Sequence, residues 1–205
     1  MRPETGNNHP SADVIKVSVR VDSGGHSFSV DTLPKRASDK KTTVEFVIVT
    51  DKTVLVPSDI FSNQDAEALL AAAGVPCNSD EQPLCISAGE MTAVAAVSKR
   101  CAELIAGRFG GRAVFASPLL EEFASDGRKL HIRTFGSTAC FKLYEDGRLR
   151  FAEMLKTAGE DDVLYYVQGL HDHFALDAYH IYIYGDRSAE TAKLLKRYFN
   201  NVECE

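Results

Sequence analysis

Apolar and polar residues alternate regularly between positions 130 and 149, and this stretch predicts a β-hairpin. It ends at Asp146-Gly147, a pair that supplies the positive φ angles of a tight hairpin turn. The alternation is interrupted once, at Gly136, Ser137 and Thr138. A small turn between two strands can hold phosphate through exposed backbone N–H groups, and it can equally be an ordinary turn.

The same patterns predict the remaining elements of the chain. Strands are expected at 14–21, 26–30, 43–50, 54–56, 112–116, 148–155 and 179–184. Helices are expected at 63–73, 91–106, 160–174 and 188–199, with one or two helical turns over 118–124. The second of these helices has Ser87 and Glu90 at capping-box spacing, followed by apolar residues with helical periodicity.

The order of these elements predicts two lobes. Residues 1–13 are polar and are expected to be a disordered lead-in. A first lobe over 14–127 and a second over 128–205 each begin with strands and continue with helices and further strands. The break at 125–127 places the boundary between them.

Composition excludes several classes of function. The chain has 205 residues, 44% of them hydrophobic, which is enough to bury a sizeable core. The net charge of −6 and the lack of a basic face argue against nucleic-acid binding. No apolar run approaches the roughly 20 residues that span a bilayer, and the N-terminus lacks the apolar core of a secretory signal. We therefore expect no membrane association and a cytoplasmic location.

Neither cysteine nor histidine forms a pattern typical of a metal site. The five cysteines show no CxxC spacing, which predicts reduced thiols. His171 and His173 fall on a predicted helix, where a two-residue separation places their side chains about 200° apart. They are therefore not expected to share a metal ion. The sequence contains no P-loop, GxSxG or HExxH motif, so no catalytic residue is assigned.

Tyrosines are concentrated in the second predicted lobe. Strand alternation sends Tyr182 and Tyr184 to one face of the sheet and Tyr179, Ile181 and Ile183 to the other. If helices cover both faces, all five residues belong to the core. If one face is open, the row Tyr182–Tyr184 becomes a candidate surface for a protein partner.

Several short stretches resemble an uncharacterised bacterial domain-of-unknown-function family. They are Leu55-Val56-Pro57 with Phe61, the run EDDVLYY at 160–166 and the run IYIYG at 181–185. The resemblance extends loosely from position 14 to position 202. It implies an α/β fold with mixed sheets: a minimal, two-lobed actin-like ATPase (ribonuclease-H-like) fold without large inserted subdomains.

ATP-binding members of the actin-like superfamily carry an Asp-containing glycine hairpin in each lobe and a Gly-Gly stretch beside the adenosine. The resemblance places the first hairpin at Asp22, Ser23, Gly24 and Gly25, where an ordinary turn is the alternative. It places the second hairpin at Gly136, Ser137 and Thr138, with Thr134 where the acid should be. The adenosine-side stretch falls on Gly185 and Asp186, so its second glycine is replaced.

Two of the three motifs thus depart from the ATP-binding pattern, since Thr134 lacks a carboxylate and Asp186 crowds a purine. The chain is therefore expected to be a non-catalytic module that acts through an unknown protein partner or as a homo-oligomer, with no assigned metal. The alternative is an ATP or sugar-phosphate binding protein with a weak phosphotransferase or ATPase site between the lobes. ATP and Mg²⁺ are expected as ligands only under that alternative.

Overall fold

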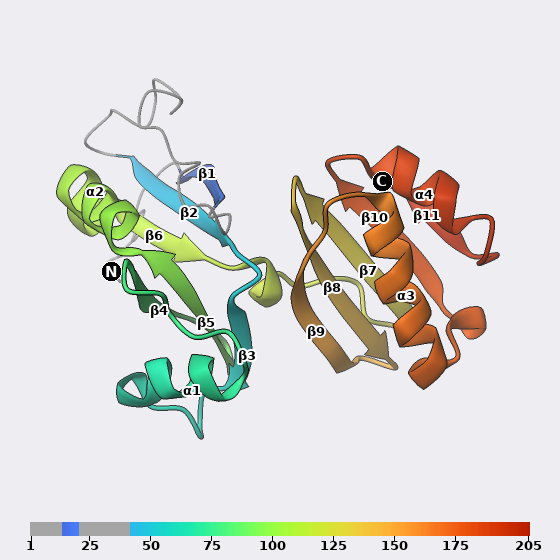
Figure 1. Cartoon of the computed structure of the whole chain (residues 1–205), viewed down its shortest axis with the longest axis horizontal. Helices are drawn as coiled ribbons and strands as arrows, with labels where there is room; N and C mark the ends of the chain where they lie inside the picture. Colours follow the sequence, from blue (N-terminus) through green and yellow to red (C-terminus); the bar gives the residue numbers. More distant parts are fainter. Residues whose placement is uncertain (1–13, 21–41) are drawn as a thin grey trace, which may run out of the picture.

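The computed structural model describes the backbone of residues 14–20 and all atoms of residues 42–205. The lead-in at 1–13, the first candidate hairpin at 22–25 and the strand predicted at 26–30 lie outside the described residues. Within the described part of the chain, the strands form three sheets. Figure 1 shows two of them in the first half of the chain and the third in the second half.

The first sheet consists of parallel strands. β2 (Thr43–Val49) lies in the middle, between β1 (Val14–Arg20) and β6 (Ala113–Ala116). All three strands fall where apolar runs predict them. The α2 helix (Lys99–Phe109) packs against one face of this sheet, where Phe46 and Phe109 meet edge to face with ring centroids 5.0 Å apart.

The second sheet is antiparallel and lies between β2 and β6 in the chain. It contains β3 (Thr53–Pro57), β5 (Met91–Ser98) and β4 (Glu81–Ala88), in that order. A 3-10 turn, η3 (Asn63–Asp65), leads into helix α1 (Ala66–Ala72), which covers this sheet. The Ser62 hydroxyl caps that turn by accepting a hydrogen bond from the Gln64 amide.

The helix predicted over 91–106 is wrong for its first half. Met91–Ser98 is a strand, and the helix begins only at Lys99. Residues 92–98 are all buried, so this central strand has no polar face whose period could distinguish it from a buried helix. Ser87 is not a helix cap, because its hydroxyl hydrogen-bonds Thr92 across the β4–β5 hairpin, which turns at Gly89 with φ +56°.

The third sheet has five strands in the order β11-β10-β7-β8-β9. The hairpin predicted at 130–149 is confirmed, with Asp146 and Gly147 at φ +47° and +80° in the β8–β9 turn. The strands of this sheet are β7 (Arg128–Phe135), β8 (Thr138–Glu145), β9 (Arg148–Lys156), β10 (His180–Gly185) and β11 (Val202–Cys204).

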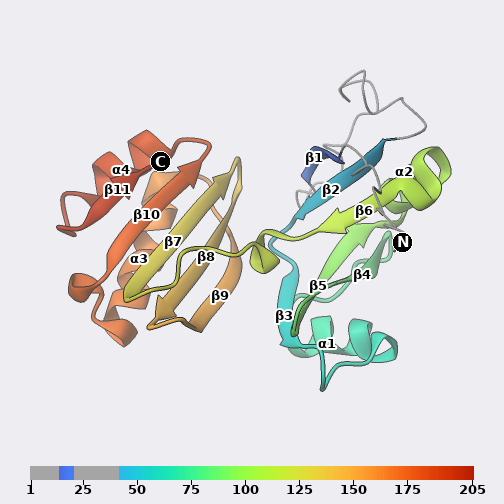
Figure 2. The same ribbon diagram turned by 180° about the vertical axis from the view of Figure 1, so that it is seen from behind.

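Helices α3 (Glu160–Phe174) and α4 (Ser188–Leu195) cover one face of this sheet (Figure 1). Tyr179, Ile181 and Ile183 lie in the core beneath them, as alternation predicts. Helix α4 ends four residues before the predicted Phe199, which the structure places in the same core. On the opposite face, Tyr182 and Tyr184 are half-buried, because the chain leaving the 3-10 turn η5 (Pro118–Leu120) crosses this face (Figure 2).

A small apolar cluster joins the first two sheets to the third. Its buried members are Val49 at the end of β2, Leu119 of η5, Cys140 of β8 and Met154 of β9. Because these side chains come from both halves of the chain, the halves share a packed boundary at η5 as well as a covalent connection there.

Candidate functional site

The β7–β8 turn is the described half of the predicted phosphate site. Gly136 takes a left-handed conformation with φ +60°, which allows the chain to reverse between the two strands. Ser137 is exposed at the tip, and its carbonyl accepts a hydrogen bond from the Thr157 amide at 2.9 Å. Thr138 is buried within β8, where it pairs with Phe135 and Lys156. Ser137 is therefore the only hydroxyl of this turn that reaches solvent in the described structure.

The end of β10 packs directly against this turn. β10 runs parallel to β7 and places Gly185 opposite Thr134. A Cβ on Gly185 would collide with the Thr134 carbonyl, and Gly185 also has φ +87°, so the residue must be glycine on both counts. The predicted adenosine-side stretch and the predicted second hairpin are thus in contact.

Thr134 serves this contact through its hydroxyl group. Its Oγ1 donates to the backbone carbonyl of Tyr184 at 3.1 Å and lies within hydrogen-bond distance of the carbonyl of Asp186. The Asp186 amide in turn donates to the Thr134 carbonyl at 3.1 Å. A carboxylate at position 134 has no hydrogen to donate, so the threonine fits these neighbours and the acid of the ATP-binding pattern does not.

The Asp186 carboxylate occupies the turn itself. Its Oδ2 accepts a hydrogen bond from the Gly136 amide at 2.9 Å. Asp186 does not cap the following helix, because α4 begins at Ser188 without any side-chain cap. The carboxylate is held instead by an amide of the other chain segment.

Arg187, which no sequence motif singles out, closes the other side of the turn. Its guanidinium donates to the Gly136 carbonyl at 2.6 Å and to the Ala158 carbonyl at 3.3 Å, and lies 3.4 Å from the Glu160 carboxylate. Gly136 is therefore held through both its N–H and its C=O by two consecutive residues. The contact joins positions 50 residues apart, so no local pattern indicates it.

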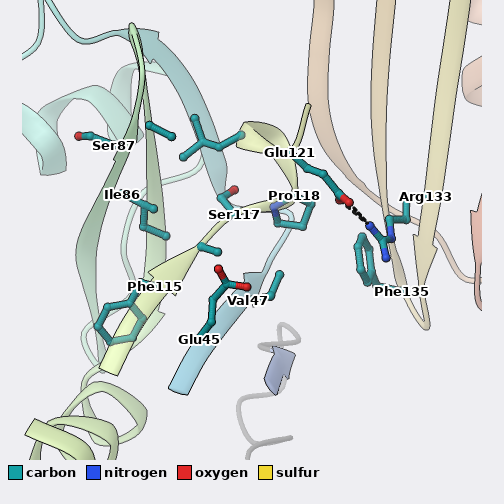
Figure 3. Close-up of a pocket in the computed structure, with 13 residues that line it drawn as sticks. Glu45, Val47, Ile86, Ser87, Phe115, Ser117, Pro118, Glu121, Arg133 and Phe135 are labelled. Atoms are coloured by element: carbon teal, nitrogen blue, oxygen red, sulfur yellow. Dashed lines mark hydrogen bonds and ion pairs between the residues drawn. The ribbon is translucent and has the colours of Figure 1, made fainter. Parts of the chain in front are cut away.

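A cavity of about 450 Å³ lies beside this site, between the first two sheets and the end of β7 (Figure 3). At its rim, the Arg133 guanidinium and the Glu121 carboxylate form an ion pair. The walls are mostly apolar and come from Val47, Ile86, Ala88, Phe115, Ala116, Pro118, Leu120 and Phe135. None of the residues of the β7–β8 turn lines it, so the cavity and the candidate phosphate turn are separate places.

No metal centre is found among the described residues, where no three histidine, cysteine or acidic side chains gather. His171 and His173 are engaged separately at the end of α3. The His171 Nδ1 accepts a hydrogen bond from the Leu176 amide at 3.1 Å, and the His173 Nδ1 donates to the Gly169 carbonyl at 2.9 Å.

All five cysteines are free thiols. Burial raises the pKa of Cys140 to about 12, so this thiol stays protonated and unreactive at neutral pH. In the described part of the chain, no helix has the length and apolar character needed to cross a bilayer.

Comparison with known proteins identifies the fold. No family model and no curated protein matches the chain, so membership of the domain-of-unknown-function family stays a hypothesis. A solved Bacteroides thetaiotaomicron protein of unknown function with an actin-like ATPase fold superposes with a TM-score of 0.74 at 13% identity, covering 94% of this chain and 90% of that one.

Two further solved structures match more loosely. The cytoplasmic domain of EpsL, an inner-membrane component of the Vibrio cholerae type II secretion system, gives a TM-score of 0.41 at 10% identity, covering 83% of this chain and 82% of that one. A chain of the PilM–PilN type IV pilus biogenesis complex gives 0.42 at 14% identity, covering 78% and 69%. These scores are too low to relate either assembly to this protein. The Bacteroides match, which spans nearly the whole chain, shows that this protein has the mixed α/β actin-like ATPase fold.

Proposed function

We propose that this protein is a non-catalytic actin-like module that works by binding another protein or a second copy of itself. The observation that carries the proposal is the hydrogen bond from the Gly136 amide to the Asp186 carboxylate. In a phosphate-binding turn, such an amide is the group that phosphate needs. Here an internal carboxylate already holds it.

Charge adds to this occupation. A phosphate that approached Gly136 would meet the negative charge of Asp186 at hydrogen-bonding distance and would have to displace it. The Arg187 guanidinium does not offset the repulsion as a free cation would, because it is engaged by two carbonyls and the Glu160 carboxylate. The Gly136 amide and the Arg187 guanidinium are therefore both engaged within the protein, which leaves the exposed Ser137 as the residue of this turn that can still donate to a nucleotide.

Metal binding at this turn has no support either. The position of the metal-orienting acid is Thr134, whose hydroxyl is engaged by backbone carbonyls. Mg²⁺ prefers carboxylates and water as ligands, and a neutral hydroxyl supplies neither the charge nor the geometry. We infer from these losses that the fold is retained for its shape and surface.

The lobe boundary belongs to the same proposal. We place it after residue 127, so that residues 14–127 and 128–205 form the two lobes. The apolar cluster of Val49, Leu119, Cys140 and Met154 supports a fixed arrangement of the lobes, since opening the boundary would expose these buried side chains. The acidic chain favours a protein partner over nucleic acid or a membrane, and we expect it to act in the cytoplasm.

The second candidate function is ATP or sugar-phosphate binding with a weak transferase or ATPase site. The actin-like fold favours it, as does the 450 Å³ cavity, whose size suits a small ligand. The cavity does not reach Gly136, and phosphate could bind the Gly136 amide only if Asp186 moved away from the turn.

Thermal-shift titrations with Mg-ATP and with inorganic phosphate, on the wild type and on Asp186→Ala, distinguish the two functions. A non-catalytic module gives no shift in the wild type, whereas the variant, with the Gly136 amide free, gains a response to phosphate. A saturable shift of the wild type with Mg-ATP supports the second function. Sedimentation velocity on the wild type over a range of concentrations then tests whether the partner is a second copy of the chain.

A further inference from the structure

The segment that connects the two halves of the chain lies flat on the outer face of the five-stranded sheet (Figure 2). We name residues 121–127 the linker strap. Two basic side chains of the sheet hold its backbone. The Lys142 ammonium donates to the Glu121 carbonyl at 2.5 Å, and the His131 Nε2 donates to the Ala124 carbonyl at 3.0 Å. Both side chains are almost completely buried, with 4% and 3% of their surface exposed.

The far end of the strap is tied to the β8–β9 turn. The amides of Asp146 and Gly147 donate to the carbonyls of Gly127 and Ser125, both at 2.8 Å. In the middle of the strap, the Phe123 ring stacks on the His131 imidazole, with centroids 4.6 Å apart and planes inclined by 20°. His131 thus contacts the strap both through a hydrogen bond and through its ring face.

The hydrogen bonds of His131 define its protonation state. Since Nε2 donates to a carbonyl, the proton of the neutral ring is on Nε2, and Nδ1 can accept from the Tyr184 hydroxyl 3.1 Å away. The neutral imidazole is therefore fully satisfied. A second proton on Nδ1 reverses this hydrogen bond, so that Nδ1 donates to the Tyr184 hydroxyl oxygen and the hydroxyl hydrogen rotates away.

The surroundings of His131 include charged and titratable groups from every neighbouring element. They are Lys129 of β7, Lys142 and Tyr144 of β8, His180, Tyr182 and Tyr184 of β10, and Glu121, Glu122 and Asp126 of the strap. Of the nearby carboxylates, Glu121 is paired with Arg133 and Asp126 with Lys129. The faces of Phe123 and Tyr182 favour a cation, whereas burial and the two lysines oppose it.

We propose that the linker strap is a pH-sensitive latch on the connection between the lobes, with His131 as the group that senses protons. When His131 is neutral, it holds Ala124 and Phe123 and keeps the strap on the sheet. When it gains a proton, a buried positive charge lies next to Lys129 and Lys142, which is energetically unfavourable. Water can solvate this charge only if the strap detaches from the sheet. This inference is independent of the proposed function.

The direction of the pH dependence follows from the environment. Burial lowers the pKa of His131 below its ordinary value of 6.5, the hydrogen bond to Ala124 partly offsets this lowering, and the charges of Lys129 and Lys142 each lower the pKa by a smaller amount. With the strap released, the imidazole returns towards its ordinary pKa. The latch is therefore fully closed above the ordinary pKa and weakens as the pH falls through it.

The chain contains no tryptophan, so Phe123→Trp supplies a single fluorophore within the strap. Acrylamide quenching of this tryptophan is measured at about pH 7.5 and about pH 5.5, on either side of the ordinary histidine pKa. We expect quenching to rise several-fold at the lower pH. In Phe123→Trp with His131→Gln it should not change, because glutamine can donate to Ala124 and accept from Tyr184 without titrating. His180→Gln, on the exposed neighbouring position of the same face, should leave the rise intact.

Equal quenching at both pH values would overturn the proposal, and so would a rise that persists with His131→Gln. If Phe123→Trp does not fold, hydrogen exchange of the wild type provides the same test. The amides of Asp146 and Gly147, which donate to the strap, should lose protection at the lower pH after correction for the intrinsic exchange rate. Unchanged protection would exclude the latch.

Discussion

Gly185 is the residue that allows the end of β10 to lie against the β7–β8 turn. We predict that Gly185→Ala lowers the free energy of unfolding by about 2–4 kcal/mol, because the added methyl group collides with the Thr134 carbonyl at a positive φ. Urea unfolding measures this loss. The control is Gly169→Ala in α3, where a Cβ has open space and an ordinary φ, and where the change should stabilise the protein by up to about 1 kcal/mol. Equal effects of the two changes would contradict the account of this contact.

Substitutions of Thr134 show whether an acid at this position would restore a metal ligand or would remove a hydroxyl that the fold needs. Thr134→Asp should destabilise the protein by about 1–3 kcal/mol, because a carboxylate faces the Tyr184 and Asp186 carbonyls and cannot donate to them. It should not create Mg²⁺ binding in calorimetry. Thr134→Ser, which keeps the hydroxyl, should retain most of the stability. Tight Mg²⁺ binding by the Asp variant would show that the metal site lacks only its acid.

At the scale of elements, β5 is the strand whose assignment the structure changes. Val94 of β5 is fully buried against α1, whereas Val114 of β6 is 46% exposed. We expect Val94→Ala to cost about 1–2.5 kcal/mol and Val114→Ala to cost less than about 0.5 kcal/mol, as measured by thermal or urea unfolding. A small cost at Val94 would mean that α1 does not cover this sheet in solution.

Helices and strands with one solvent-exposed face could be predicted from the sequence, whereas β5 could not. Helix α3 matches its prediction at both ends, since Val163, Val167 and Leu170 form a buried stripe opposite polar residues. β5 is buried on both faces, so periodicity cannot separate it from a helix. Strands β4 and β11 were not predicted. Pro83 interrupts the pattern of β4, and β11 has only three residues, which are too few to show a pattern.

The candidate site shows the same division. Gly136, Gly185 and Asp186 can each be singled out from turn chemistry and resemblance. The hydrogen bond from Gly136 to Asp186 depends on β10 pairing with β7 in parallel, a register set by the tertiary fold. Sequence reasoning therefore singles out these three residues of the candidate site, but neither Arg187 nor the hydrogen bonds that fill the turn.

At the scale of the whole molecule, the chain has the actin-like ATPase fold, and its candidate phosphate turn is occupied by a carboxylate of the same chain. The Asp186 carboxylate and the Arg187 guanidinium hold Gly136 from two sides. A packed apolar cluster joins the two halves of the chain beside η5. These features together suit a module of fixed shape that presents its surface to a partner.

Isothermal titration of the wild-type protein with ATP in the presence of Mg²⁺, paired with a phosphate-release assay, measures whether the occupied turn still admits a nucleotide. A non-catalytic module gives no binding heat up to millimolar nucleotide and no release of phosphate above the background hydrolysis of ATP. Submillimolar, magnesium-dependent binding with measurable turnover would contradict it and would show that Asp186 gives way to the nucleotide.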